Sequence, residues 1–296
     1  MKRRFFFFSV TFFAFLLFVG CTKGRVNLFS WEDEERLGAE IHEQIVSDTI
    51  QYRILPESNY NEVYSRINTI CKTLSKSPIS RSQQASVMWS IYILEDDQIV
   101  NAFSTPGGGI YIYTGLLRFM KSEAELAGVL SHEMAHVYCR HATSALTKNL
   151  GLSLLLGMLG ASSDIGGALS DLASSALLLK FSRDDESEAD KYAVKYLSST
   201  DYDIGEFITF FRMMEEEEDK EFSETSSLRT IMEFYSTHPN PQHRIEAIKT
   251  EWARCGNRRG NKYVDEYKEL LSKLPIPEQM KEEDPVTYSV EQVKLY

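Results

Sequence analysis

The chain of 296 residues is long enough for one large domain with short extensions. Hydrophobic residues make up 43% and charged residues 25%, an ordinary globular mixture that can bury a core and that argues against wholesale disorder. The formal net charge of −11 argues against nucleic acid as a partner, because binding to phosphates requires a basic surface.

The first twenty residues form a separate unit. A positively charged start, MKRR, precedes the apolar run FFFFSVTFFAFLLFVG and then Cys21. This pattern is typical of a secretory signal peptide over 1–20, and its end, LFVGC, resembles the lipobox of bacterial lipoproteins, in which the cysteine carries lipid. Phe18 stands where that pattern usually has leucine, so ordinary cleavage and an uncleaved anchor stay open as alternatives. We expect lipidation at Cys21, followed by a tether over 21–30.

Two helices are predicted before the first strands. Ser30 can cap a helix that starts at Trp31, since Asp33 stands at the capping-box position. A second helix is predicted within 59–78, where apolar residues recur at helical spacing. These residues are Val63, Ile67, Ile70 and Leu74.

Three short strands are predicted next, because the sequence becomes rich in aromatic and β-branched residues. They are SVMWSIYILE (86–95), QIVNAF (98–103) and IYIYTG (110–115). Between the last two, STPGGG (104–109) is a turn that glycine favours. We expect the three strands to form a small antiparallel sheet.

The rest of the chain is predicted to be mainly helical. Ser122, with Glu125 three residues later, can cap a helix over 122–146. Residues 150–181 hold two apolar runs, each shorter than the ~18 residues that span a bilayer. They are interpreted as two core helices or a helical hairpin, with a membrane-touching or substrate-gating element as the alternative. Further helices are expected over 182–200, 204–219, 224–235 and 262–273.

The stretch SHEMAHVYCRH, residues 131–141, contains the candidate metal site. Positions i and i+4 share a helix face, so His132 and His136 point their imidazoles at one place, and Glu133 stands beside it. Two ligands plus a carboxylate that takes a proton from water is the arrangement of HExxH zinc peptidases. His141, five residues beyond His136, is expected to lie well round the helix and to be a poor ligand. An amphipathic helix with surface histidines is the alternative interpretation.

A third ligand is available in DDESEAD, residues 184–190. Glu186 and Asp190 are four apart and share a helix face. Glu186 can complete a His, His, Glu set that leaves the fourth zinc position open, and Asp190 can accept a hydrogen bond from a ligand histidine. Glu188 competes as the ligand if the register differs, and an acidic solvated helix is the alternative. We expect one Zn²⁺ per chain.

Together these motifs resemble the zinc metallopeptidases of peptidase family 48, which are gluzincins. The resemblance covers about residues 30–255 and rests on four blocks: VNAFSTPGGGIYIYTGLL, SEAELAGVLSHEMAHVYCRH, FSRDDESEAD and THPNPQHR. It implies an α+β, mainly helical, gluzincin-like domain over 31–255, with a small antiparallel sheet beside the HExxH helix. Residues 256–296 are then a helical and charged C-terminal extension.

The resemblance also implies roles for individual residues. It places zinc on the first glutamate of ExxxD, Glu186. It gives His238 and Arg244 the task of holding the oxyanion of a tetrahedral intermediate, or His238 that of capping zinc when the enzyme is idle. Its sheet presents an edge strand to an extended substrate, which implicates Asn101, Ala102 and Phe103.

The implied function is a zinc endopeptidase that cleaves misfolded or misassembled proteins of the bacterial cell envelope. The chain shows neither further hydrophobic spans nor a tetratricopeptide extension, so the compact lipoprotein type of the family is the nearest likeness. We expect a periplasm-facing lipoprotein, held by its lipid at the outer rather than the inner membrane. A zinc-binding chaperone-like or scaffold lipoprotein with little proteolytic activity is the alternative. Residues 215–237 could also cover the cleft and keep the isolated protein latent.

Overall fold

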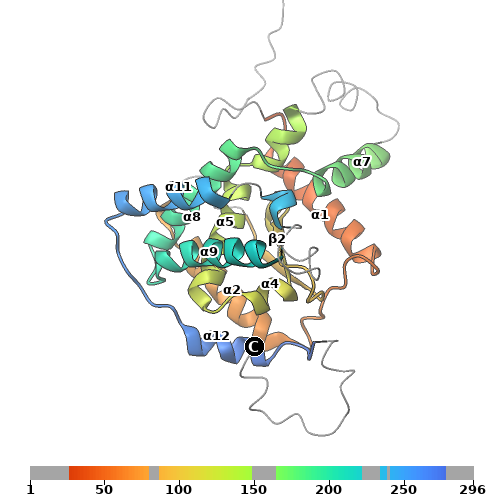
Figure 1. The fold of residues 1–296 in the computed structure, drawn as a ribbon. Coiled ribbons are helices and arrows are strands. Elements are labelled where there is room, and N and C mark those ends of the chain that lie inside the picture. Colours follow the sequence, from red (N-terminus) through yellow and green to blue (C-terminus); the bar gives the residue numbers. More distant parts are fainter. Residues whose placement is uncertain (1–26, 80–86, 149–164, 222–233, 239–240, 278–296) are drawn as a thin grey trace, which may run out of the picture.

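The computed structural model describes residues 27–79, 87–148, 165–221, 234–238 and 241–277 (Figure 1). The predicted signal peptide, Cys21, residues 150–164 of the apolar segment and the end of the C-terminal extension lie outside the described residues. The helices are α1 (Trp31–Ser47), α2 (Asn61–Ser75), α4 (Thr114–Phe119), α5 (Glu123–Tyr138), α7 (Ile165–Leu177), α8 (Arg183–Ser198), α9 (Ile204–Glu221), α11 (Pro241–Arg254) and α12 (Val264–Ser272). The strands are β1 (Ser90–Leu94), β2 (Ala102–Ser104) and β3 (Gly109–Tyr113), and the short 3₁₀ helix η1 (Pro106–Gly108) joins β2 to β3. The expected mainly helical α+β fold is confirmed.

Local capping signals placed two helix starts correctly. The Ser30 hydroxyl accepts from the backbone N–H of Asp33, whose carboxylate accepts from the Ser30 N–H, so the predicted capping box is present on α1. Ser122 caps α5 by accepting from the Glu125 N–H. These interactions join residues three apart in sequence, which is why the sequence alone reveals them.

The sheet is mixed, so the prediction of an antiparallel sheet is wrong for one of its two pairings. The strand order is β1-β3-β2, with β1 parallel to β3 and β2 antiparallel to β3. The turn through η1 makes β2 and β3 a hairpin, and β3 then inserts beside β1. Of the segment predicted as a strand over 98–103, only the end pairs with β3, through the Asn101 carbonyl and the residues from Ala102 onwards. Pairing order depends on the path of the chain, which a propensity pattern does not contain.

The two faces of the sheet are covered by different helices, α1 and α7 on one side and α2 and α5 on the other (Figure 1). Alternate residues of β3 show this division, since side chains along a strand point to opposite faces. Ile110 and Ile112 join the main core, while Tyr111 and Tyr113 join a smaller core under α1. The alternation of these β3 side chains thus gives the sheet two apolar faces, one covered by α2 and α5 and the other by α1.

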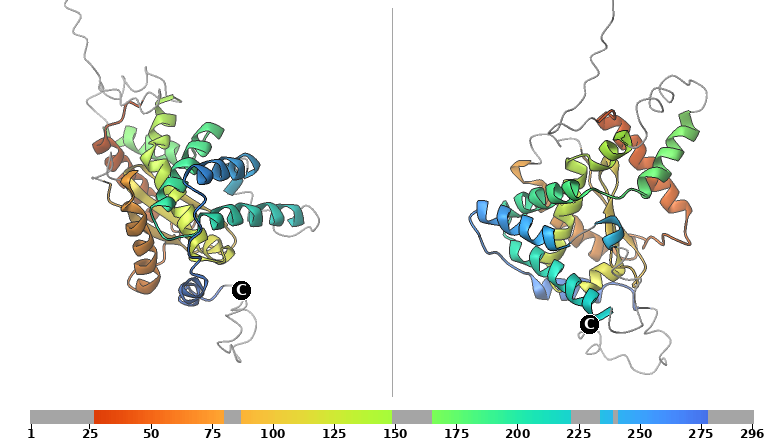
Figure 2. Two further views of the ribbon diagram at one scale, coloured as in Figure 1. Left: turned by 90° about the vertical axis from the view of Figure 1, so that its left-hand side faces the viewer. Right: turned by 45° about the horizontal axis from the view of Figure 1, so that its top comes forward.

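Helix α5 lies at the centre of the molecule, against α8, α9, α2 and β2 (Figures 1 and 2). Its residues 123–137 are all buried. A helix enclosed on all sides normally carries few polar groups, so the polar residues of its HExxH segment require partners in the interior. In Figure 2, α9 extends beyond the other helices.

Residues on either side of the predicted domain, 31–255, pack against it. Asn27, within the predicted tether, is 3% exposed and donates to the Thr143 hydroxyl at 2.8 Å. Tyr267 and Leu270 of α12, within the predicted extension, are buried in the main core. The helical part of the extension therefore packs as part of the domain. Within the described part of the chain, no helix is both long and apolar enough to cross a membrane.

Candidate metal centre

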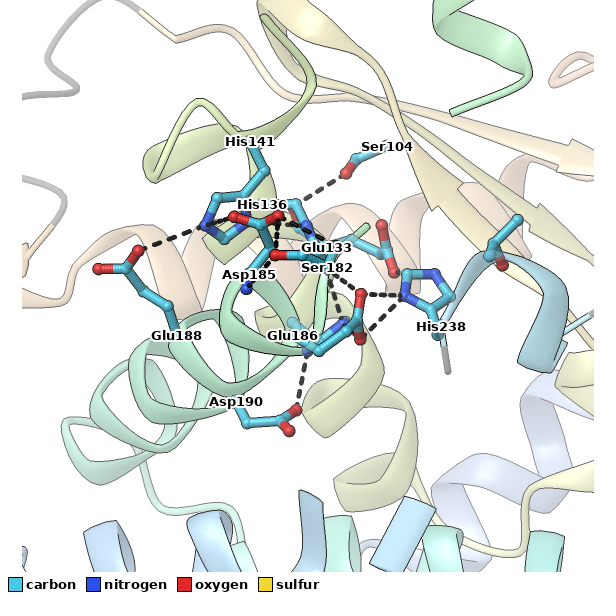
Figure 3. A network of polar contacts seen from close by, with 12 residues as sticks. Ser104, Glu133, His136, His141, Ser182, Asp185, Glu186, Glu188, Asp190 and His238 are labelled. Atoms are coloured by element: carbon cyan, nitrogen blue, oxygen red, sulfur yellow. Dashed lines mark hydrogen bonds and ion pairs between the residues drawn. The ribbon is translucent and has the colours of Figure 1, made fainter. Parts of the chain in front are cut away.

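Two helices bring the candidate ligands together at the middle of the molecule. Helix α5 carries His132, Glu133 and His136, and α8, which packs against it, carries Glu186. A capping box at Ser182 starts α8 one turn before Glu186, so the carboxylate leaves the helix toward α5. Figure 3 shows Glu186 between His136 and His238.

The candidate ligand atoms lie at the separations that a small cation requires. The Nε2 atoms of His132 and His136 are 2.9 Å apart. The Glu186 carboxylate oxygens lie 3.3 Å from His132 Nε2 and 3.4 Å from His136 Nε2. Ligand atoms about 2.0–2.1 Å from a tetrahedral zinc lie about 3.3 Å from one another, so the observed spacing suits that ion. The sequence interpretation needed Glu186 at this place, and the fold puts it there.

The electrostatics of the cluster favour a bound cation. Burial and the charge of Arg244 lower the pKa of His132, but hydrogen bonds to two carboxylates outweigh them and raise it to about 9. Burial and the neighbouring His132 hold the pKa of His136 well below its usual value. Burial raises the pKa of Glu186, yet the charges of His238 and Arg244 hold it well below its usual range. The negative carboxylates that stabilise a proton on His132 would also stabilise a metal cation bound instead of that proton.

Unsatisfied polar atoms at the same place support the fit to zinc. Glu133 Oε2 and His238 Nε2 are buried and, within the part of the chain that the structure describes, have no hydrogen-bond partner. Buried polar groups normally find partners, so atoms of this kind mark a place for water or an ion. His132, His136, Glu186 and His238 each offer one atom, and these atoms lie within 4.8 Å of one another. Imidazole and carboxylate are ligands that zinc takes.

Asp190 and Arg244 contact two of the candidate ligands, His132 and Glu186, and each other. The Asp190 carboxylate lies 3.0 Å from His132 Nδ1, the geometry expected of an acceptor that orients a ligand histidine. Arg244, on α11, contacts both Asp190 oxygens, from Nε at 3.0 Å and from Nη2 at 2.8 Å. Its Nη1 lies 3.1 Å from Glu186. The guanidinium thus holds two carboxylates in this structure, and its suggested role at the oxyanion stays a prediction.

His238 fills the space in front of the cluster. Its Nδ1 lies 3.1 Å from Glu186 Oε1, and its Nε2 lies 3.5 Å from Glu133 Oε1. The ring packs against Phe234 with ring centroids 5.1 Å apart, and the residue is 1% exposed. Both suggested roles of His238, at the oxyanion and as a cap on zinc in the idle enzyme, stay predictions.

Strand β2 forms the edge of the sheet next to the cluster. At the two ends of β2, the Tyr113 N–H donates to the Asn101 carbonyl and the Thr105 N–H donates to the Gly109 carbonyl. Hydrogen-bonded positions alternate along an antiparallel pair, so the backbone polar groups of Ala102 and Ser104 point toward the open edge. The Ser104 hydroxyl donates to the Glu133 carbonyl at 3.1 Å, which ties the strand to α5. Ser104 was missed by the sequence interpretation, which stopped one residue earlier.

A cleft opens between β2, the end of α7 and His238. Of the three predicted substrate-binding residues, Asn101 and Phe103 line this cleft, whereas the Ala102 side chain is buried at 1% exposure. Ala102 can therefore contribute only through its backbone. The remaining walls combine polar residues, among them Gln51, Thr105 and Thr237, with the apolar or aromatic residues Ile41, Tyr52, Ala176, Leu177, Leu179 and Phe181.

The expected position of His141 is wrong. Helix α5 ends at Tyr138, and Arg140 adopts a left-handed backbone with φ of 56°. The chain therefore turns back, and His141 Nδ1 lies 2.9 Å from His136 Nδ1. Glu188, proposed as a competing ligand, points toward His141 instead, with its Oε2 at 3.5 Å from His141 Nε2 (Figure 3). No sequence signal indicated the left-handed residue, since it is not a glycine.

A buried HExxH helix, a carboxylate from a second helix and an adjacent edge strand together define a metallopeptidase-type site. Comparison with known proteins gives the same class. Residues 64–252 match the profile described as Peptidase family M48, which is more than half of the chain. The chain belongs to peptidase family M48.

Similar proteins include metalloproteases of mitochondria and bacteria. The chain is 30% identical over 229 residues to the mitochondrial metalloendopeptidase OMA1 of Schizosaccharomyces pombe, covering 77% of this chain and 63% of that protein. It is 26% identical over 184 residues to the beta-barrel assembly-enhancing protease of Yersinia pestis, covering 58% and 36%. It is 30% identical over 161 residues to metalloprotease YcaL of Escherichia coli (strain K12), covering 50% and 62%. The matched regions span less than two thirds of each of these curated relatives.

Proposed function

We propose that this protein is a zinc-dependent endopeptidase. The observation that carries the proposal is the convergence of two imidazole nitrogens and the Glu186 carboxylate beside Glu133, whose Oε2 lacks a hydrogen-bond partner among the described residues. Membership of family M48 and the printed names of relatives, which include metalloendopeptidases, support the same activity.

Each part of the site has a task in peptide hydrolysis. His132, His136 and Glu186 would hold a zinc ion, which would supply the Lewis acidity needed to polarise a carbonyl and to acidify water. Glu133 takes the proton of the attacking water and passes it to the leaving amine. The outward-facing backbone groups of Ser104 and the carbonyl of Ala102 hold the substrate as an added strand, while the Ala102 N–H donates to Asn101 Oδ1 at 2.9 Å.

His238 must yield its place when a substrate enters, because it now contacts both Glu133 and Glu186. It then either donates to the developing oxyanion or simply leaves the cleft. When it returns, it caps the cluster and keeps the idle enzyme closed. The residues that precede it, 222–233, lie outside the described residues.

We further propose that the substrates are unfolded or misassembled proteins of the bacterial envelope. Support comes from the printed name of the beta-barrel assembly-enhancing protease and from the signal-like pattern before Cys21. Lipid on Cys21 then holds the enzyme at the periplasmic side of a membrane, the outer one in our proposal. An extended substrate strand suits chains that have lost their fold, since such chains expose long stretches of backbone for pairing.

The test is a Glu133→Gln variant assayed on unfolded casein. We expect cleavage to fall by about 10²–10⁴-fold while one zinc per chain is retained. Glu35→Gln, an exposed carboxylate on α1, serves as the matched control and should cleave normally. Unchanged cleavage by Glu133→Gln would remove Glu133 from the mechanism. Envelope proteins that accumulate with the inactive variant identify the substrates.

A further inference from the structure

The turn after α5 builds a second contact to a metal ligand. The left-handed backbone of Arg140 is held in place because its guanidinium donates to Glu34 Oε1 at 2.8 Å and to the Phe29 carbonyl, and packs over Trp31 at 4.5 Å. This turn brings His141 back against α5, where it is 1% exposed. The buried carboxylate of Glu34 and the partly exposed Phe29 and Trp31 thus maintain an otherwise unfavourable backbone conformation directly after α5.

The positions of the protons follow from the contacts of each ring. His136 Nε2 faces His132 Nε2 at 2.9 Å and Glu186 Oε1 at 3.4 Å, so it is the atom directed at the metal position. A ligand nitrogen needs its lone pair, so neutral His136 carries its proton on Nδ1. That Nδ1–H has His141 Nδ1 as its acceptor, at 2.9 Å. His141 then carries its own proton on Nε2, which faces Glu188 Oε2 at 3.5 Å.

We propose that His141 is a positioning residue for the metal ligand His136, and that Glu188 selects the tautomer in which His141 can accept. The proposal deepens the proposed function and rests on it. The arrangement parallels the other ligand, where Asp190 lies 3.0 Å from His132 Nδ1. Both zinc-facing imidazoles thus have a dedicated partner on the far nitrogen, one a carboxylate and the other a histidine backed by a carboxylate.

The contact between His136 Nδ1 and His141 Nδ1 can select the tautomer of His136, which packing of the ring cannot do. Phe181 stacks on the His136 ring with centroids 4.1 Å apart and planes at 30°, which limits tilting. A flat apolar ring does not distinguish one tautomer of His136 from the other. A hydrogen-bond acceptor at Nδ1 does so, because it stabilises the form whose lone pair is on Nε2.

A different assignment is possible for the same residues. Cys139, His141 and Glu188 offer ligand atoms within 4.8 Å of one another, so they could hold an ion of their own. The contact between the two Nδ1 atoms favours the positioning role. An ion on His141 Nε2 would require the His141 proton on Nδ1, and that nitrogen could then no longer accept from His136. The two assignments predict different metal contents and different effects of changing Cys139.

The experiment measures zinc affinity by competition with a chelator, in the full chain carrying Glu133→Gln so that cleavage plays no part. His141→Leu keeps much of the side-chain volume and removes the acceptor; we expect affinity to fall about 10–100-fold. His141→Asn restores an acceptor oxygen near Nδ1 and should recover part of the loss. Glu188→Gln should weaken binding in the same direction by a smaller factor. Asp184→Asn, an exposed carboxylate on the same helix, is the control and should stay within about 2-fold.

A second readout separates positioning from simple loss of structure. In the cobalt-substituted protein, His141→Leu should shift the visible absorption bands, while circular dichroism of the metal-free protein stays unchanged. If His141→Leu does not fold, Glu188→Gln decides the matter. Zinc affinity within about 2-fold of the parent for His141→Leu, or for Glu188→Gln where His141→Leu does not fold, would overturn the proposal. Two zinc ions per chain, one of them lost in Cys139→Ser, would also overturn it in favour of a separate site. Failure of peptide cleavage would bear only on the proposed function.

Discussion

The buried glutamate at the start of α5 makes the stability of this protein depend on pH. Glu125 is 1% exposed and accepts from the backbone N–H of Lys121 at 2.7 Å, close to Glu206. Burial raises the pKa of Glu125 to about 7 from 4.5, an effect strengthened by Glu206 and opposed by the hydrogen bond from Lys121. The folded state therefore holds a proton that the unfolded chain has already released.

The sign and size of the effect follow from linkage. Because the folded pKa is raised, the contribution of Glu125 is fully present below pH 4.5 and is lost as the pH rises through 7. A shift of this size corresponds to about 3 kcal/mol of unfolding free energy, at about 1.4 kcal/mol per pKa unit. Glu125→Gln keeps an oxygen that can accept from Lys121 and removes the titration. We expect this variant to become more stable relative to the parent by about 3 kcal/mol between pH 4.5 and pH 8.

The assay is urea unfolding of the parent and Glu125→Gln at half-unit pH steps, with metal removed throughout. Glu35→Gln, which removes an exposed carboxylate, controls for the change in net charge. Taking the difference between variant and parent cancels the titration of all other groups, provided that the substitution leaves them in place. A difference in unfolding free energy that stays flat within about 0.5 kcal/mol over this range would refute the reasoning.

Three further predictions concern packing, bracing and metal. Gly128→Ala should lower stability by about 1–3 kcal/mol, because its Cβ would lie 2.6 Å from Phe207 Cδ2; an unchanged melting temperature would contradict the close packing of α5 on α9. Asp190→Asn should cost about 3 kcal/mol in urea unfolding of the metal-free protein, since it takes a charge partner from buried Arg244; a cost below about 1 kcal/mol would argue against this bracing. Zinc at about 100 times its dissociation constant should raise the unfolding free energy by about 2.7 kcal/mol, and Glu186→Gln should reduce this gain at the same zinc concentration, so an equal zinc effect in both proteins would remove Glu186 as a ligand.

Local rules predicted much of this protein because they act over three or four residues. The capping box of Ser30 and Asp33 depends only on neighbouring residues, and so does the shared helix face of His132 and His136. The pairing of the HExxH helix with Glu186 also came from sequence, because the spacing of DDESEAD matched a known motif. In these cases the side chains that interact are already adjacent along a helix, or belong to a pattern that recurs.

Other features depended on how distant segments meet. The sheet was predicted to be antiparallel, but β3 lies between β1 and β2, and the parallel pairing results from the course of the chain. The bracing of Asp190 by Arg244 joins α8 to α11, which are separate in sequence and meet only in the folded protein.

His141 shows most directly why local pattern was not enough. A continuing helix would carry it away from His136, whereas one left-handed residue, Arg140, turns it back into contact. That backbone conformation is unfavourable by itself and persists because Glu34 and Trp31, more than a hundred positions earlier, hold the Arg140 side chain. The residues that form a helix and offer metal ligands were therefore encoded locally. The tertiary contacts decided where the helix stops, and so which side chain stands behind the ligand.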